Sequence, residues 1–342
     1  MAARRRVFVT DSAAGLVAVA GRDPFAPLRA RSECTLWGSA QRPTAEELIA
    51  GLRECSALIC LLTDRVDARA LGAAPQLEVV SSVSVGVDHV DVAAASARGI
   101  AVAHTPGVLT ETTAELAMAL MLAVARRVVE ADADVRAGAW TEARRWQLDG
   151  YLGRDLSGAT LGLVGLGAIG QAVARRAAAF GMRILGWSRS GRAVPGVSRV
   201  PLEALLAEAD FVSVHVASSP ETRGLLGEAE LALLKPGAVL INTARGDVVS
   251  EPALVRALVE GRLGGAGLDV FAREPIGPGH PLAAFRNVVL TPHIGSASRA
   301  TRLRMLELAV ANVLDVLDGK LPRHCVNRTE LAGRARARGL PP

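Results

Sequence analysis

Short hydrophobic runs recur along the chain, and segments with helical periodicity separate them. In the first third of the chain these runs cover residues 7–9, 57–62, 79–82 and 100–103. Each run is rich in residues that favour strands and is bounded by polar residues or glycine. Between the first two runs, Thr44 and Glu47 have the capping-box spacing that begins a helix. This alternation predicts a parallel sheet covered by helices on both faces.

A long helical segment follows Thr105-Pro106-Gly107, from about residue 112 to residue 137. Hydrophobic residues nearly encircle it. A helix that is hydrophobic on every face has to be buried, between domains or between subunits. We therefore expect a twofold homodimer, built largely on the part of this helix that covers residues 115–129.

A second series of strands and helices comes after that helix. Its expected strands cover residues 160–164, 182–187, 211–215, 238–242, 265–269 and 287–290. A final helix, at about 298–317, is expected to return to the first domain. A chain of 342 residues is long enough for two domains. The predicted boundaries are 1–104 plus 292–342 for the substrate domain and 105–291 for the nucleotide-binding domain.

Composition argues against several classes of function. The net charge of +5 comes from 39 basic and 34 acidic residues, with no basic cluster inside the expected domains, which disfavours nucleic-acid binding. The longest hydrophobic stretch, residues 116–125, is far below the roughly 20 residues that span a membrane. The four cysteines show no CxxC pair and no metal-ligand spacing, which favours free thiols in a reducing compartment. The first apolar run is too short for a signal peptide, so we expect a cytoplasmic protein. Because the sequence shows no set of metal ligands, we expect no bound metal.

The sequence Gly165-Leu166-Gly167-Ala168-Ile169-Gly170 follows a predicted strand directly and opens a helix. In this context each glycine of the GxGxxG pattern has a physical task. The first allows a tight turn, the second lets the backbone approach a pyrophosphate, and the third lets the helix pack closely on the strand. The free N–H groups and the dipole at the helix N-terminus favour the phosphates. A glycine-rich turn without a ligand is the alternative that this context disfavours.

The next strand indicates which dinucleotide is bound. An NAD site usually carries an acidic residue, about 20 residues further on, that binds the ribose hydroxyls. Here the chain reads Trp187-Ser188-Arg189-Ser190-Gly191-Arg192, without a carboxylate. A hydroxyl and two guanidinium groups suit the 2′-phosphate of NADP(H). We therefore expect NADP(H) to be preferred and NAD(H) to be possible, the alternative being that both arginines face water.

Three strand ends in the second series carry residues capable of catalysis. Arg245 follows the strand at 238–242, Glu274 lies beyond the strand at 265–269, and His293 follows the last strand. Ligands of open α/β sheets bind at the carboxyl ends of the strands, where all three residues are expected. Taken singly, each has an ordinary explanation as a structural histidine or a solvated loop residue. Together on one nucleotide-binding sheet they favour an active site.

These segments resemble the D-isomer-specific 2-hydroxyacid dehydrogenases, and more closely their glyoxylate/hydroxypyruvate reductase branch. The resemblance runs from residue 7 to about residue 327. It is most evident in Ser84-Val85-Gly86-Val87-Asp88, His104-Thr105-Pro106-Gly107-Val108-Leu109-Thr110 and His293-Ile294-Gly295-Ser296-Ala297. One departure concerns the Trp-x-x-Trp pattern of many relatives, because Trp140 is followed here by Ala143, and Trp146 comes three residues later.

The resemblance implies roles for individual residues. The family's catalytic arginine, glutamate and histidine would be Arg245, Glu274 and His293. The substrate-carboxylate-binding amides would be those of Val85 and Gly86, and the acid beside the nicotinamide would be Asp269. Further cofactor contacts are expected from Thr243, Ala244, Arg245, His293 and Gly295, and further substrate contacts from Arg245 and Ser296. The implied fold class is α/β with two doubly wound parallel sheets, one in a Rossmann-type cofactor domain and one in a flavodoxin-like substrate domain.

The expected reaction is reduction of a small 2-oxo acid, glyoxylate or hydroxypyruvate, to its D-2-hydroxy acid. A hydride reaches the 2-oxo carbon while His293, kept protonated by Glu274, gives a proton to the carbonyl oxygen. Arg245 can pair with the substrate carboxylate and polarise the carbonyl. The alternatives are a D-lactate, D-3-phosphoglycerate or phosphite dehydrogenase, or a nucleotide-sensing protein on the same fold. A sensor has no need of a proton donor, so the Arg–Glu–His set disfavours it.

Overall fold

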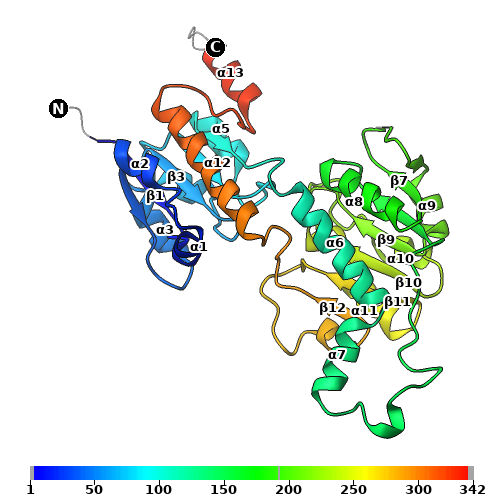
Figure 1. Cartoon of the computed structure of the whole chain (residues 1–342). Helices are drawn as coiled ribbons and strands as arrows, with labels where there is room; N and C mark the ends of the chain where they lie inside the picture. Colours follow the sequence, from blue (N-terminus) through cyan, green and yellow to red (C-terminus); the bar gives the residue numbers. More distant parts are fainter. Residues whose placement is uncertain (1–3, 192, 338–342) are drawn as a thin grey trace. The chain divides into compact units, whose positions relative to one another are not determined.

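The computed structural model describes residues 4–191 and 193–337, and these form two compact units (Figure 1). Unit 1 comprises the chain up to residue 109 and from residue 297 onward, and unit 2 comprises residues 110–296. The chain therefore builds most of unit 1, then all of unit 2, and then returns to complete unit 1.

Unit 1 contains a five-stranded sheet. Its strands are β1 (Arg6–Val9), β2 (Glu33–Leu36), β3 (Ala57–Cys60), β4 (Val79–Ser82) and β5 (Ala101–Ala103). Its helices are α1 (Ala14–Ala20), α2 (Ala26–Arg31), α3 (Ala45–Leu52), α4 (Ala68–Gly72), α5 (Val92–Arg98), α12 (Arg299–Leu317) and α13 (Arg328–Ala337). Every strand pair is parallel and the order is β2-β1-β3-β4-β5, which is the flavodoxin-like order.

Both faces of this sheet are buried, which explains its nearly continuous hydrophobic strands. Phe8 and Leu58 pack on one face with α3, α4 and α5, whereas Val7 and Ile59 pack on the other with α2 and α12. The predicted capping box is confirmed at the start of α3, where Thr44 is the N-cap and Glu47 bonds back to it.

Unit 2 contains a seven-stranded parallel sheet in the order β12-β11-β10-β9-β6-β7-β8. Its strands are β6 (Thr160–Val164), β7 (Arg183–Trp187), β8 (Ser198–Arg199), β9 (Phe211–Val214), β10 (Ala238–Asn242), β11 (Leu263–Leu268) and β12 (Val288–Leu290). Its helices are α6 (Thr110–Ala125), α7 (Val128–Arg136), α8 (Ala168–Ala179), α9 (Leu202–Glu208), α10 (Glu228–Ala232) and α11 (Glu251–Val259), with 3-10 turns η1 (Glu142–Arg144), η2 (Gly246–Val248) and η3 (Pro281–Ala284).

The order of these strands reverses between β6 and β9, which makes that pair the topological switch point of a Rossmann-type sheet. Leu161 and Phe211 pack with α6 and α8 on one face, and Val212 and Leu240 pack with α9, α10 and α11 on the other. The predicted fold class, two doubly wound parallel sheets, is confirmed.

The expected single helix over 112–137 is wrong. The chain forms α6 and α7, and it breaks at Arg127, whose backbone is left-handed at φ 52°. The apolar residues of α6, including Met118, Leu120 and Met121, are buried against the sheet and α8 of the same unit. Packing within one chain therefore accounts for the apolar residues around this helix, and they do not by themselves require a second subunit.

The unit boundaries fall at 109/110 and 296/297, five residues later than each predicted boundary. Thr105 stays in unit 1 because its N–H and its hydroxyl both donate to the carbonyl oxygen of Ser84. Residues 291–296 stay in unit 2 because Thr291 and Gly295 are bound to Asp269. His293 therefore belongs to the nucleotide-binding unit.

Candidate active site

The GxGxxG turn joins β6 to α8 at the switch point of unit 2. Gly165 has φ 110°, and a Cβ there would lie 2.7 Å from the carbonyl group of His215. A Cβ on Gly170 would overlap the carbonyl oxygen of Gly165. Gly167, the N-cap of α8, faces open space, with nothing within 4 Å of where its Cβ would be. The first and third glycines therefore serve packing, and the second leaves room for a ligand at the helix N-terminus.

This difference predicts opposite effects for two alanine substitutions. Gly167→Ala should fold normally, because its backbone (φ −69°, ψ −170°) suits any residue. Its methyl group would occupy the space open to the pyrophosphate, so we expect about tenfold or greater loss of dinucleotide affinity. Gly170→Ala should instead lower stability by about 1–3 kcal/mol, through overlap with the backbone. Thermal melts and fluorescence titrations measure both; a Gly167→Ala variant that binds as well as the parent would contradict this assignment.

Two buried hydroxyls that follow strands of the same sheet have no hydrogen-bond partner in the described part of the chain. The Oγ of Ser188, directly after β7, and the Oγ1 of Thr243, directly after β10, are buried and make no hydrogen bond within the described part of the chain. Buried polar atoms are normally satisfied. Together with the open space at Gly167 and the N-terminus of α8, they fit a bound dinucleotide.

Arg189 is exposed and its guanidinium pairs with Glu221, at 3.1 Å between Nη1 and Oε2. Glu221 belongs to the loop that follows β9, and it was not anticipated from the sequence. Ser190 is exposed beside Arg189. Arg192, the second arginine considered for the 2′-phosphate, lies outside the described residues.

The loop that carries Arg245 is fixed at the end of β10. The buried Asn242 accepts a hydrogen bond from Ala244 N at 3.0 Å and donates one to the Arg245 carbonyl at 2.9 Å. A Cβ on Gly246 would overlap the backbone of Phe271. Glycine at this position therefore lets the Arg245 loop pass directly against the segment that leads to Glu274.

The structure brings Glu274 and His293 together. Glu274 Oε2 lies 2.8 Å from His293 Nδ1, and its Oε1 accepts a hydrogen bond from Phe271 N at 3.0 Å. Partial burial raises the pKa of Glu274. Three neighbours lower it by more: His293 through its hydrogen bond and charge, Phe271 through its N–H, and Arg245 through its charge. The pKa of Glu274 therefore lies below its usual range. An ionised Glu274 accepts the proton on Nδ1, so the Nε2 of His293 is the nitrogen that remains for a substrate.

Asp269 organises the loop that presents His293. The side chain is fully buried, with Oδ1 accepting from Thr291 Oγ1 and Ile294 N and Oδ2 accepting from Gly295 N, all at 2.7–2.8 Å. Burial raises the pKa of Asp269, and these hydrogen bonds oppose that effect. His293 itself has a left-handed backbone at φ 53°. A non-glycine residue in this conformation is strained and persists only where its surroundings enforce it, which is common at functional sites.

Gly295 and Ser296 complete this loop. A Cβ on Gly295 would lie 3.3 Å from Asp269 Oδ2, so the loop lies close to the carboxylate. The carbonyl of Gly295 also accepts a hydrogen bond from Thr113 Oγ1 of α6 at 3.0 Å. The predicted residues Arg245, Glu274, Asp269, His293 and Gly295 thus stand on neighbouring strand ends of one sheet.

The predicted carboxylate-binding residues Val85 and Gly86 belong to unit 1, in the loop after β4. Ser84 Oγ donates to the carbonyl of Gly86 at 2.5 Å, and His104 Nδ1 lies 2.8 Å from the carbonyl of Val85. Because both carbonyls are engaged in this way, the loop is fixed in one conformation. Val85 is exposed, so this part of the loop lies at the surface.

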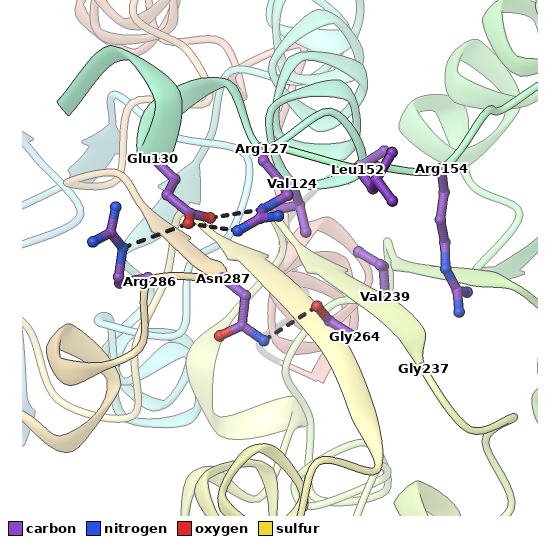
Figure 2. A pocket seen from close by; sticks show the side chains of 12 residues that line it. Val124, Arg127, Glu130, Leu152, Arg154, Gly237, Val239, Gly264, Arg286 and Asn287 are labelled. Atoms are coloured by element: carbon purple, nitrogen blue, oxygen red, sulfur yellow. Dashed lines mark hydrogen bonds and ion pairs between the residues drawn. The ribbon is translucent and has the colours of Figure 1, made fainter. Parts of the chain in front are cut away.

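A hollow of about 480 Å³ lies at the amino ends of the unit 2 strands, opposite the carboxyl ends that carry the candidate site (Figure 2). It is lined near the amino ends of β10, β11 and β12 by Gly237, Gly264 and Asn287. Figure 2 shows Glu130 between Arg127 and Arg286, paired with both. The hollow is remote from the strand ends that carry His293. Its charged lining residues are Arg127, Arg154, Arg286 and Glu130, and Glu130 pairs with two of these arginines.

Two absences hold for the part of the chain that the structure describes. Within residues 4–191 and 193–337, no group of three or more histidine, cysteine or acidic side chains could hold a metal ion. No helix in the same ranges is long and apolar enough to cross a membrane.

Fold and site together define a dehydrogenase that binds a nicotinamide dinucleotide. A family model described as "D-isomer specific 2-hydroxyacid dehydrogenase, NAD binding domain" matches residues 118–295. The chain is 50% identical to a glyoxylate reductase of Korarchaeum cryptofilum over 300 residues. This matched region covers 86% of this chain and 90% of that protein. The chain belongs to the D-isomer-specific 2-hydroxyacid dehydrogenase family, as the sequence motifs predicted.

Solved structures agree with this assignment. A protein from Thermus thermophilus is 48% identical with a TM-score of 0.83, over 94% of this chain and 99% of that one. An NADPH-dependent glyoxylate/hydroxypyruvate reductase from Sinorhizobium meliloti, in complex with NADP and malonate, is 35% identical with a TM-score of 0.84, over 96% and 98% of the two chains.

Proposed function

We propose that the chain reduces glyoxylate, hydroxypyruvate or both to glycolate and D-glycerate, with NADPH preferred over NADH. The observation that carries this proposal is the Glu274–His293 hydrogen bond at a strand end of a dinucleotide-binding sheet, beside the charge of Arg245. The names of the relatives, glyoxylate reductase and NADPH-dependent glyoxylate/hydroxypyruvate reductase, support the choice of substrate and cofactor.

The proposed chemistry divides between the cofactor and three side chains. The dinucleotide, held by the 165–170 turn, the α8 N-terminus and the hydroxyls of Ser188 and Thr243, supplies a hydride when bound. His293 Nε2 gives a proton to the carbonyl oxygen, because Nδ1 is occupied by Glu274. Arg245 pairs with the substrate carboxylate and stabilises negative charge on the carbonyl oxygen. In this proposal unit 1 is the substrate domain, and Val85 and Gly86 bind the carboxylate through their N–H groups.

A substrate panel tests the proposed function. Glyoxylate, hydroxypyruvate, pyruvate and 3-phosphohydroxypyruvate would be compared at a fixed NADPH concentration, with loss of reduced cofactor as the signal. We expect the highest kcat/KM with glyoxylate or hydroxypyruvate. A higher value with pyruvate or the phosphorylated acid would replace this proposal by a D-lactate or D-3-phosphoglycerate dehydrogenase.

The cofactor preference is tested by Arg189→Ala. A charge-assisted hydrogen bond to the 2′-phosphate contributes about 1.5–3 kcal/mol, roughly ten- to hundredfold in affinity. The variant should lose that much affinity for NADPH and little for NADH, and a second change, Ser188→Asp, should invert the preference. In the parent enzyme, a ratio of kcat/KM for NADPH over NADH at or below one would remove the NADP assignment.

The homodimer remains a proposal, now with a different surface as its basis. Val128 and Val135 of α7 are exposed, and Trp146 and Leu148 in the following segment are 79% and 84% exposed. Exposed apolar side chains gathered on one segment mark an interaction surface. Light scattering should give about twice the 35.5 kDa chain mass, and a double change of Trp146 and Leu148 to serine should yield monomers. A parent protein that is monomeric at micromolar concentration would contradict the proposal.

The cytoplasmic location of the protein also stays a prediction.

A further inference from the structure

Glu221 occupies a position that the sequence pattern did not reveal. It lies in the loop after β9, and β9 is separated from β7 by β6 alone, about 10 Å across the sheet. The side chains of Arg189 and Glu221 bridge this distance together, and Nη1 of Arg189 lies 3.1 Å from Oε2 of Glu221. An acidic group is therefore present beside the end of β7, although the β7 end itself has none.

The Glu221 carboxylate is held in place. Ser219 Oγ donates to Glu221 Oε2 at 2.6 Å. The buried Thr222 fixes the turn, since Thr222 Oγ1 accepts from Ser219 N at 2.8 Å and donates to the carbonyl of Ala217 at 2.6 Å. The Ser219 hydroxyl and the charge of Arg189 keep the pKa of Glu221 below its usual range. The group is thus a fixed negative charge at neutral pH.

A second guanidinium lies at the same turn. Gly191, at the end of the Ser188–Gly191 turn, is so close to Arg199 of β8 that a Cβ on it would lie 2.9 Å from the guanidinium. Among the described residues, the cations of Arg189 and Arg199 and the anion of Glu221 therefore lie around the end of β7. A 2′-phosphate gains from the cations and is repelled by the anion, whereas ribose hydroxyls can donate to the anion.

We infer that Glu221 is a specificity residue of the cofactor site, which opposes the 2′-phosphate and keeps the enzyme able to use both NADPH and NADH. This inference rests on the proposed position of the adenosine ribose at the end of β7. The Arg189–Glu221 pair is more than 60% exposed on both sides, so it is weak enough for a phosphate dianion to displace. The preference for NADPH is accordingly modest in the parent enzyme and is limited by Glu221.

The test is Glu221→Gln, which removes the charge and keeps the shape. Dissociation constants would be measured for NADPH and NADH, and for 2′,5′-ADP and 5′-AMP as probes that lack the nicotinamide. We expect NADPH and 2′,5′-ADP to bind about three- to tenfold more tightly, with NADH and 5′-AMP unchanged or weaker. Equal changes in all four ligands, or no change in any, would overturn the inference.

Glu228→Gln is the matched control. Glu228 forms an exposed ion pair of the same kind with Arg256 in unit 2, at 2.9 Å, and its loss should leave the ratio of the dissociation constants unchanged. Arg189→Ala separates the two proposals. If it weakens NADPH no more than NADH, the cofactor assignment itself fails. If it weakens NADPH selectively while Glu221→Gln has no effect, only the role of Glu221 fails.

Discussion

Replacing His293 by alanine is expected to lower kcat by about two to four orders of magnitude, the usual contribution of a positioned general acid. The Nδ1 of His293 is held by the Glu274 carboxylate, and Asp269, at the neighbouring strand end, anchors the loop that carries His293 and Gly295. Dinucleotide affinity should change little, because the proposed pyrophosphate site is the 165–170 turn. Single-turnover rates at saturating NADPH measure the loss directly.

His280→Ala provides the control for this experiment. His280 pairs with Glu251 at 2.9 Å in the same unit, so it matches the His–Glu pairing without standing in the proposed site. Its replacement should leave kcat within a few-fold of the parent. If both variants retain activity, His293 is not the acid and the mechanism is wrong.

Replacing Arg245 by alanine is expected to lower kcat/KM for the 2-oxo acid by about two to three orders of magnitude, the usual cost of losing one donor that stabilises developing negative charge. Arg245→Lys should recover only part of this, because lysine keeps the charge but cannot bind a carboxylate through two parallel hydrogen bonds. Steady-state kinetics against the 2-oxo acid at saturating cofactor gives the values.

Arg256→Ala is the appropriate comparison, since Arg256 lies on α11 and pairs with Glu228 at the surface. A general effect of removing one positive charge from unit 2 would appear in both variants. If Arg245→Ala is no worse than Arg256→Ala, Arg245 does not contact the substrate.

Much of the fold follows from local patterns. Of the twelve strands in the described residues, ten were expected, and the capping box at Thr44 located the start of α3. The two that were missed are edge strands, β2 and β8, of which β8 has two residues. Edge strands bury little, so their hydrophobic pattern is weak. The break at Arg127 was also missed, because no glycine or proline marks it.

The candidate site also contains residues that the sequence could predict and residues that it could not. Arg245, Glu274 and His293 follow strands, and strand ends can be recognised in the sequence. Glu221 follows a strand as well, but its closeness to Arg189 depends on the strand order, in which β6 lies between β7 and β9. The anchoring of the His293 loop by Asp269 could not be predicted. Asp269 accepts hydrogen bonds from the backbone N–H groups of Ile294 and Gly295. Almost every residue has such an N–H group, so the residue types at these positions do not reveal the contact.

The chain order of the two units has a consequence for synthesis on the ribosome. α12 closes one face of the unit 1 core with Met305, Leu306 and Val313, packed against Val7, Ile59 and Val79. Those strands are made early, but α12 emerges only after all of residues 110–296. At 5–20 residues per second this delay is roughly 10–40 s. During this delay the strands of unit 1 lack α12, and the sheet face that α12 covers stays exposed. Unit 2 can therefore fold before unit 1 does. A growing chain with an exposed apolar face is a natural client for a ribosome-associated chaperone.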